Sequence, residues 1–252
     1  MPARRKTAIA SPNNGGKNFR KQRESLVKRE YKIVLLTYLI MQLSSPVGVP
    51  FTYYLLNGLG FSGKDLESRS LSLWLLFSFS AALIVTLYCL RREMRFRSQK
   101  AASFPVSAFW ASAGVFLALF GQLAAARIEM LFGVEPGSEN TREIIGMIEK
   151  APAIFLVAAV FGPILEEVVF RKIIFGTCMQ RLGFFPSALI SSLFFSAAHM
   201  EFEHLLLYTA IGFAFCYVYR KTNRILVPIF SHVSMNVIAI LSQLDPKIFS
   251  MF

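Results

Sequence analysis

The sequence is poor in charged residues, in cysteine and in histidine. Only 17% of its 252 residues are charged and 54% are hydrophobic, whereas soluble domains carry about 25% charged residues. The three cysteines, Cys89, Cys178 and Cys216, fit neither a disulfide framework nor a metal ribbon, so we expect inert buried thiols. The composition excludes an ordinary soluble domain and predicts an integral membrane protein.

The positive charge is concentrated at the N-terminus. Residues 1–32 hold ten Lys or Arg against two Glu, or +8 of the formal net charge of +12. A basic arm can bind nucleic acid, but beside a membrane span it more economically anchors on anionic lipid at the cytoplasmic face. We therefore expect a lipid partner and no nucleic acid. Residues 1–17 are predicted to be disordered, and residues 18–32 to form a juxtamembrane amphipathic helix.

Long apolar runs make up most of the remaining chain. They predict an all-α fold, a polytopic membrane bundle of about seven transmembrane helices at residues 33–56, 71–90, 105–131, 152 to beyond 171, 187–199, 204–219 and 225–243. Pro46 and Pro50 predict a kink or break in the first run. If that run splits into two crossings, the bundle has eight helices.

The loops between these runs differ in charge. The N-terminal arm and the stretches 91–100, 171–181 and 220–224 are basic, whereas the loop 133–150 is acidic. By the positive-inside rule, the N-terminus is cytoplasmic and the acidic loop is external. The chain thus divides into the arm, three N-terminal spans (33–132), the external loop with a short helix at 141–149, a core at 151–243 and a tail (244–252).

Two adjacent glutamates interrupt the fourth apolar run. An acidic residue at mid-bilayer costs roughly 2.5–3.5 kcal/mol, so such a residue is a functional candidate. Glu167 and Arg171 are four residues apart, share one helix face and are predicted to pair. Glu166 projects about 100° away and has no such local partner. Its partner must come from another helix.

All three histidines lie between residues 199 and 232. His199 closes the fifth run, and His232 and Asn236 are one turn apart in the seventh. Measured from the cytoplasmic turn, Glu166 lies about 22 Å up its helix, His199 about 20 Å, and His232 and Asn236 roughly 12–18 Å. These depths favour one shared site. His204 fits no such pattern and is expected to lie at the membrane interface.

Three short patterns, each on a separate span, resemble those of the CAAX prenyl protease and bacteriocin-processing (CPBP, or Abi) family of intramembrane proteases. The patterns are Glu166-Glu167-x-x-x-Arg171, Phe195-x-x-x-His199 and His232-x-x-x-Asn236. The stretch 212–236 resembles the closing segment of the family. The resemblance covers residues 150–240 and leaves the first three spans unassigned.

The resemblance implies a catalytic core at 151–243 that hydrolyses a peptide bond at the membrane, in the plasma membrane of a bacterium. Eukaryotic members trim three residues from prenylated proteins, and bacterial members are linked to bacteriocin maturation, immunity and envelope regulation. We therefore expect a protein or peptide substrate, whose identity and prenylation the sequence leaves open.

The catalytic roles follow from the chemistry of these side chains. Glu166, assisted by His199, is expected to activate a water molecule, and His232 and Asn236 to stabilise the oxyanion. Glu167 and Arg171 complete the site and are expected to orient the helix. Phe195 is expected to pack behind His199.

Other interpretations of the same residues stay open. Glu166, His199 and His232 also match the donor set of a catalytic zinc site, although no HExxH motif is present and a metal-free mechanism accounts for the same residues. Buried Glu and His also serve proton-coupled transporters, against which stand the small size and the lack of a repeat. A non-catalytic membrane adaptor with a partner in immunity or signalling is the third alternative.

Overall fold

The structure, a computed structural model, describes residues 14–94 and 101–244. Within these ranges every regular element is a helix, which confirms the predicted all-α class. The elements are α1 (Asn14–Leu43), α2 (Ser45–Gly58), α3 (Leu66–Met94), α4 (Phe104–Leu131), α5 (Glu139–Lys150), α6 (Ile154–Leu156), η1 (Val157–Phe161), α7 (Gly162–Glu166), η2 (Glu167–Phe175), α8 (Gly176–Leu182), α9 (Phe184–Ala198), η3 (Phe202–His204), α10 (Leu205–Thr222) and α11 (Leu226–Leu244). The start of the basic arm (1–13) and residues 245–252 of the tail lie outside the described residues.

The first predicted span is broken near its prolines. α1 ends at Leu43 and α2 begins at Ser45, and the two helices differ in direction by 59°. Pro46 lies in the first turn of α2, where its missing N–H removes no helical hydrogen bond. At its other end α1 begins at Asn14, so the predicted disorder is wrong for residues 14–17, and the arm and the first span share one helix.

The helix that carries the two glutamates is built from several consecutive helical segments. α6, η1, α7, η2 and α8 follow one another without interruption from Ile154 to Leu182, so the predicted helical continuation beyond Arg171 is confirmed. η1 and η2 are wider π-helical segments. η1 ends directly before Gly162 and Pro163, and its wider turn accommodates the missing N–H and the ring of the proline.

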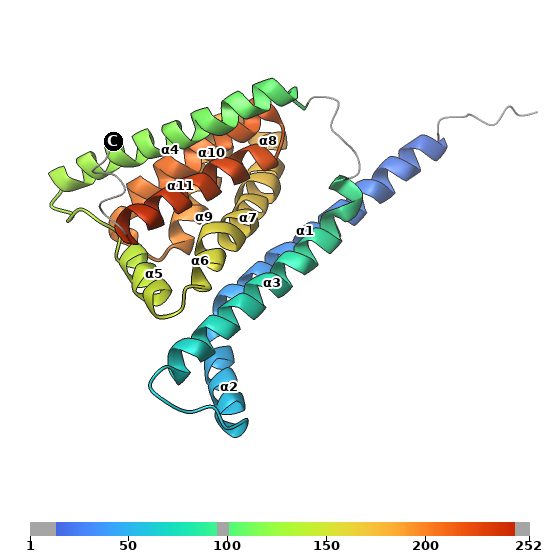
Figure 1. Cartoon of the computed structure of the whole chain (residues 1–252). Coiled ribbons are helices and arrows are strands. Elements are labelled where there is room, and N and C mark those ends of the chain that lie inside the picture. The colour runs from blue at the N-terminus through green and yellow to red at the C-terminus, as the bar shows by residue number, and fades with distance from the viewer. Residues whose placement is uncertain (1–13, 95–100, 245–252) are drawn as a thin grey trace, which may run out of the picture.

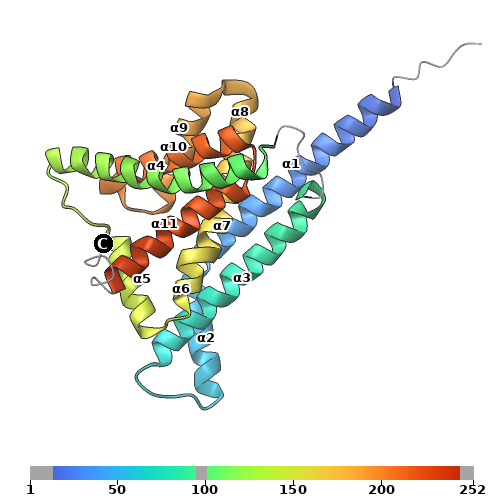
Figure 2. The same ribbon diagram turned by 45° about the horizontal axis from the view of Figure 1, so that its top comes forward.

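This composite helix lies between two groups of helices (Figure 1). α1 and α3 run side by side as a pair on one side, and α4, α9, α10 and α11 form a bundle on the other. Figure 2 shows the same division from a second direction. One buried apolar cluster joins both groups to the composite helix. Phe170 contacts the ring of Tyr38 of α1 and that of Phe195 of α9, at centroid distances of 5.9 and 5.4 Å. The helix that carries the two glutamates is therefore packed between elements that lie far apart in the sequence.

Fewer helices than predicted satisfy the length and hydropathy of a membrane span on their own. Among the described residues, four helices do so, within Leu66–Glu93, Phe104–Leu131, Phe202–Thr222 and Leu226–Leu244, and the bent pair α1–α2 makes up to five. α9 has 15 residues, or about 22 Å at 1.5 Å per residue, less than the roughly 30 Å of a bilayer core. The fold is a polytopic helical bundle, and the count of seven or eight is not confirmed.

The loop 133–150 contains the short helix that its sequence predicts. α5 spans Glu139–Lys150 and begins at Ser138, whose side chain accepts a hydrogen bond from the backbone N–H of Thr141. Ile145 and Ile148 are buried against α6 and α11, so one face of this helix belongs to the core.

The three cysteines differ in burial. All three are free thiols, but only Cys216 is fully buried, which corrects the expectation for Cys89 and Cys178.

The contact between α9 and α10 depends on a missing side chain. A Cβ at Gly212 would lie 2.9 Å from Cβ and 3.0 Å from Cα of Ser192, so the two backbones approach too closely for any larger residue. Because a backbone atom cannot rotate away, Gly212→Ala forces the helices apart. This contact sets the distance between Phe195 of α9 and Phe215 of α10, which both reach the buried cluster.

We predict that Gly212→Ala destabilises the folded protein by about 1–3 kcal/mol, the usual cost of overpacking. Thermal unfolding in detergent micelles measures the effect. Gly146→Ala is the matched control, because a Cβ at Gly146 of α5 meets nothing within 4 Å, so it should leave stability unchanged or raise it. Equal unfolding temperatures for the two variants would contradict the close packing of α9 and α10.

Candidate active site

Glu167 and Arg171 form the predicted ion pair, and both side chains are fully buried. Arg171 Nη1 lies 3.2 Å from Glu167 Oε1, and each side chain is 0% exposed. The N–H groups of Arg171 are nevertheless not aimed at an acceptor, because its three nitrogens and Glu167 Oε2 have no hydrogen-bond partner. The attraction is therefore electrostatic, in an interior where charges are weakly screened.

Aromatic rings surround the guanidinium. Its carbon lies 4.2 Å from the ring centroid of Phe195, 5.3 Å from that of Phe215 and 5.9 Å from that of Phe170. A cation within about 6 Å of a ring face is attracted to it. The three rings thus offset part of the cost of burying Arg171 with a single counter-ion.

His232 of α11 joins the two glutamates. Its Nδ1 lies 2.8 Å from Glu167 Oε1, and its Nε2 lies 3.7 Å from Glu166 Oε2. An ionised carboxylate only accepts hydrogen bonds, so we assign the proton to Nδ1, which donates to Glu167. The other nitrogen then faces Glu166. The prediction that Glu166 finds its partner on another helix is confirmed.

The two neighbouring glutamates consequently have different surroundings. Glu167 is fully buried and contacts both Arg171 and His232, whereas the side chain of Glu166 keeps 19% of its surface exposed. The contact from Glu166 to His232 is too long for a hydrogen bond. Glu167 is thus committed to its two partners, and Glu166 is the carboxylate that a small molecule can reach.

His199 lies beside this group and is held by aromatic packing. Its Nδ1 is 2.8 Å from the carbonyl oxygen of Phe195, its ring packs against that of Phe195 at 4.6 Å, and it stacks on Tyr208 at 4.1 Å. The Phe195 ring also contacts His232 at 5.7 Å, so its predicted place behind His199 is confirmed and it separates the two histidines. Among the described residues, His199 makes no hydrogen bond to Glu166.

Asn236 lies one turn from His232 on α11 and reaches the same composite helix. Its Nδ2 donates to the carbonyl oxygen of Ala158 in η1 at 3.1 Å. One amide N–H is therefore used to join α11 to the composite helix, and the side chain is only partly buried. The structure gathers Glu166, Glu167, Arg171 and His232 in direct contact, with His199 and Asn236 at the edges.

A polar cluster beside His199 was not anticipated. Tyr208, which stacks on His199, donates from its hydroxyl to Glu201 Oε2 at 2.6 Å. The same oxygen accepts from Ser138 at 2.8 Å, and Glu201 Oε1 accepts from the backbone N–H of Asn140 at 2.8 Å. Glu201 thus ties the start of α5 to the residue that stacks on His199. Ser138 and Asn140 are each more than sixty residues from Glu201 in the sequence, so no local pattern identifies these contacts.

His204 lies near the start of the candidate span Phe202–Thr222, and its expected place at the membrane interface stays a prediction. It is buried, with Nδ1 3.0 Å from Glu129 Oε2 and Nε2 3.1 Å from the carbonyl oxygen of Gly137. Glu129 Oε1 also accepts from the backbone N–H of Leu207 at 2.9 Å. A carboxylate near the end of the third apolar run was a usable signal, because a buried Glu requires a partner. The pair fastens α4 to the beginning of α10.

The side chains proposed as zinc ligands are not gathered as a ligand set. In the described part of the chain, no group of three or more His, Cys, Asp or Glu side chains is placed to hold a metal ion. Each histidine has its Nδ1 occupied, by Glu167 for His232 and by a carbonyl for His199, which leaves one nitrogen on each ring. The donors are chemically suitable for zinc, but their arrangement does not fit it, and we derive no step through a metal.

The buried ion pair predicts strong energetic coupling between its two members. Removing one member of a buried pair strands the other charge and costs about 3–5 kcal/mol, so Glu167→Gln and Arg171→Met should each destabilise strongly. The double variant should be less destabilised than the sum of the two, by up to about 3 kcal/mol. Denaturant unfolding of the four proteins measures this coupling.

The matched control is the ion pair between Lys172 and Glu93, which has a similar distance of 3.0 Å but is partly exposed. The same cycle at that pair should give a coupling of about 0–1 kcal/mol. Equal coupling at the two pairs would show that burial does not strengthen the Glu167–Arg171 interaction.

Glu201 predicts a measurable pH dependence. Burial acts to raise the pKa of Glu201, but hydrogen bonds from Tyr208, the Asn140 N–H and Ser138 outweigh it, so the pKa lies below its ordinary value of 4.5. A pKa lowered by folding contributes stability that is complete above the unfolded pKa and is lost as pH falls through the folded pKa. The unfolding temperature of the wild type should therefore fall below about pH 4.5. The unfolding temperature of Glu201→Gln should fall less over the same pH range.

Glu203→Gln is the control, because Glu203 lies in the same turn but is exposed. It should keep the acid sensitivity of the wild type. Identical pH profiles for the Glu201 and Glu203 variants would remove Glu201 from the account of acid stability.

Comparison with known proteins finds a matching family and similar bacterial proteins. The family described as Type II CAAX prenyl endopeptidase Rce1-like matches residues 148–238, which include both glutamates and both site histidines. The chain is 41% identical over 227 residues to the "Putative membrane peptidase YdiL" of Bacillus subtilis (strain 168), covering 87% of this chain and 91% of that protein. It is 28% identical over 209 residues to the "Membrane-embedded CAAX protease MroQ" of Staphylococcus aureus (strain USA300), covering 78% and 80%.

No solved structure gives a significant match. The identity to the Bacillus protein extends over nearly the whole of both chains, so the relationship includes the N-terminal spans that carry no recognisable motif. The apolar helices and these relatives together identify an integral membrane protein. The chain belongs to the CAAX prenyl protease and bacteriocin-processing family, and it is a membrane protease.

Proposed function

We propose that Glu166 is the general base of this protease and that Glu167 holds the site in place. The unequal surroundings of the two carboxylates carry the proposal. Glu167 is fully buried between Arg171 and His232, while Glu166 is partly exposed and has only a long contact to His232. Two carboxylates in contrasting environments take different roles in acid–base chemistry.

In the proposed reaction Glu166 takes a proton from water, and the hydroxide attacks the carbonyl carbon of the scissile peptide bond. The charge that develops on the carbonyl oxygen is stabilised by the second amide N–H of Asn236 and by Nε2–H of His232. In this proposed reactive state the His232 ring carries a proton on both nitrogens, and Nδ1–H stays on Glu167. When the tetrahedral intermediate collapses, the C–N bond breaks and the amine leaves with the proton from Glu166. The chain residues return to their initial protonation states.

His199 assists Glu166 in this proposal. Its Nδ1 faces the carbonyl of Phe195, so in the neutral ring Nδ1 carries the proton and Nε2 is an acceptor. An acceptor beside the carboxylate helps to orient the attacking water. Stacking on Tyr208 keeps the ring in one orientation, which supports this role.

We propose a membrane-associated protein or peptide as the substrate, with or without a prenyl group. The Staphylococcus relative is named as a CAAX protease and the Bacillus relative as a putative membrane peptidase. Because these relatives are bacterial and the N-terminal arm is basic, we place the protein in a bacterial plasma membrane, with the arm on anionic lipid of the cytoplasmic leaflet.

Cleavage of a membrane-peptide library by the purified protein tests the proposal. Glu166→Gln should lower the rate by about 10²–10⁴-fold, the usual contribution of a general base, while chelator-treated wild type should keep its rate. The control is Glu203→Gln, an exposed glutamate outside the site. Unfolding temperatures of all proteins establish that each variant is folded.

The other outcomes separate the alternatives. Loss of cleavage on chelation that zinc reverses would make Glu166, His199 and His232 metal ligands. A Glu166→Gln protein as active as the wild type would remove Glu166 from the mechanism. A Glu166→Ala protein that keeps its effect in cells would favour a non-catalytic adaptor.

A further inference from the structure

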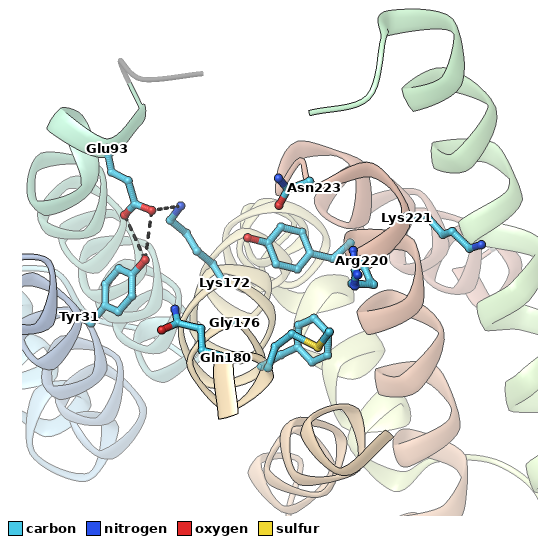
Figure 3. Close-up of a pocket in the computed structure, with 11 residues that line it drawn as sticks. Tyr31, Glu93, Lys172, Gly176, Gln180, Arg220, Lys221 and Asn223 are labelled. Atoms are coloured by element: carbon cyan, nitrogen blue, oxygen red, sulfur yellow. Dashed lines mark hydrogen bonds and ion pairs between the residues drawn. The ribbon is translucent and has the colours of Figure 1, made fainter. Parts of the chain in front are cut away.

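A polar cavity that does not include Glu166 or Glu167 lies where four helical elements converge. It has a volume of about 590 Å³ and is lined from α1, α3, the η2–α8 part of the composite helix and the end of α10 (Figure 3). Its polar lining includes Tyr31, Glu93, Lys172, Gln180 and Arg220. None of these residues belongs to the proposed catalytic machinery.

The single carboxylate of this cavity is already engaged. Glu93 accepts a hydrogen bond from the hydroxyl of Tyr31 at 3.1 Å and one from Lys172 Nζ at 3.0 Å. Both partners lie on the same side of the cavity, as Figure 3 shows. Glu93 therefore neutralises Lys172 and fixes its position, and it leaves the opposite wall without a negative charge.

That opposite wall carries two neighbouring basic residues that differ in direction. Lys221 extends away from the cavity, with its Nζ 5.2 Å from the ring centroid of Tyr217 and 5.9 Å from that of Trp110 of α4. Arg220 is exposed and, within the described part of the chain, has no ion pair or hydrogen bond. Its guanidinium has no counter-ion among the described residues.

The cavity also lies at the end of membrane-spanning helices. Glu93 ends one candidate span, and Thr222, two residues after Arg220, ends another. Phe175 and Met179 add apolar surface to the lining. A basic cavity between helices at this depth meets the head groups of lipids, and the apolar residues suit the adjoining glycerol and first acyl carbons.

We propose that this cavity binds the phosphate group of an anionic phospholipid. Arg220 supplies the net positive charge and a planar pair of N–H donors that matches phosphate oxygens. Lys172, held by Glu93 at the opposite wall, supplies a further N–H donor. The volume of about 590 Å³ exceeds what a free phosphate ion fills and accommodates a head group. The site differs from the lipid contact expected of the basic arm, because its donors, Lys172 and Arg220, lie outside residues 1–32.

Titration of the full-length protein in neutral detergent with dioleoyl phosphatidylglycerol tests the proposal. Bound lipid is counted by native mass spectrometry, and the unfolding temperature is recorded in parallel. Phosphatidylglycerol should bind and stabilise the wild type, whereas phosphatidylcholine and inorganic phosphate should not. Arg220→Gln should weaken phosphatidylglycerol binding at least about tenfold, as expected for a lost charge-assisted contact.

Lys221→Gln is the matched control, because it removes the same charge from the adjacent residue. The ammonium group of Lys221 lies by the rings of Trp110 and Tyr217 and points away from the cavity. This variant should bind phosphatidylglycerol as the wild type does, and Arg220→Lys should keep part of the affinity. Equal weakening by Arg220→Gln and Lys221→Gln would reduce the effect to net charge and overturn the site. Equal stabilisation by inorganic phosphate and by the lipid would assign the cavity to free phosphate instead.

Discussion

The site depends on one buried carboxylate that serves two partners. Glu167 neutralises Arg171 and holds Nδ1 of His232, although the three groups come from only two helices, η2 and α11. Each charge would be costly to bury alone. Together with the aromatic rings around Arg171 they form a group in which each member stabilises the others, and this group fixes the position of α11 against the composite helix.

The architecture follows from the need to surround that group. The composite helix lies between the α1–α3 pair and the bundle (Figure 1), and its buried apolar residues contact side chains from both. Gly212 allows α9 and α10 to approach closely, and Phe195 and Phe215 from these helices enclose Arg171. Further away, Glu129 binds His204 in the turn before α10, and Glu201 binds residues at the start of α5. Tyr208 connects Glu201 to His199, because it donates a hydrogen bond to the carboxylate and stacks on the imidazole ring. The polar contacts therefore form a connected scaffold around a small reactive centre.

The sequence predicted the parts of the site that depend on helix periodicity. Glu167 and Arg171 pair because they are one turn apart, and His232 and Asn236 reach the composite helix from the same face for the same reason. It did not predict which histidine meets Glu166, because depth along a helix leaves the rotation and tilt of the helices undetermined. The contacts of His204 with Glu129 and of Glu201 with Ser138 and Asn140 were missed because these partners are distant in sequence. The predicted span count is not confirmed, since α9 is short and π-helical segments divide the composite helix.

The central claim is that one glutamate positions His232 while its neighbour remains available for chemistry. Nitrogen-15 NMR of the ring of His232 in lipid bilayers tests it most directly. We expect Nδ1 to carry a proton, its resonance to shift in Glu167→Gln, and the Nε2 resonance to respond to Glu166→Gln. A ring with unprotonated Nδ1, or one whose Nδ1 resonance is unchanged by Glu167→Gln, would contradict the division of roles between the two carboxylates.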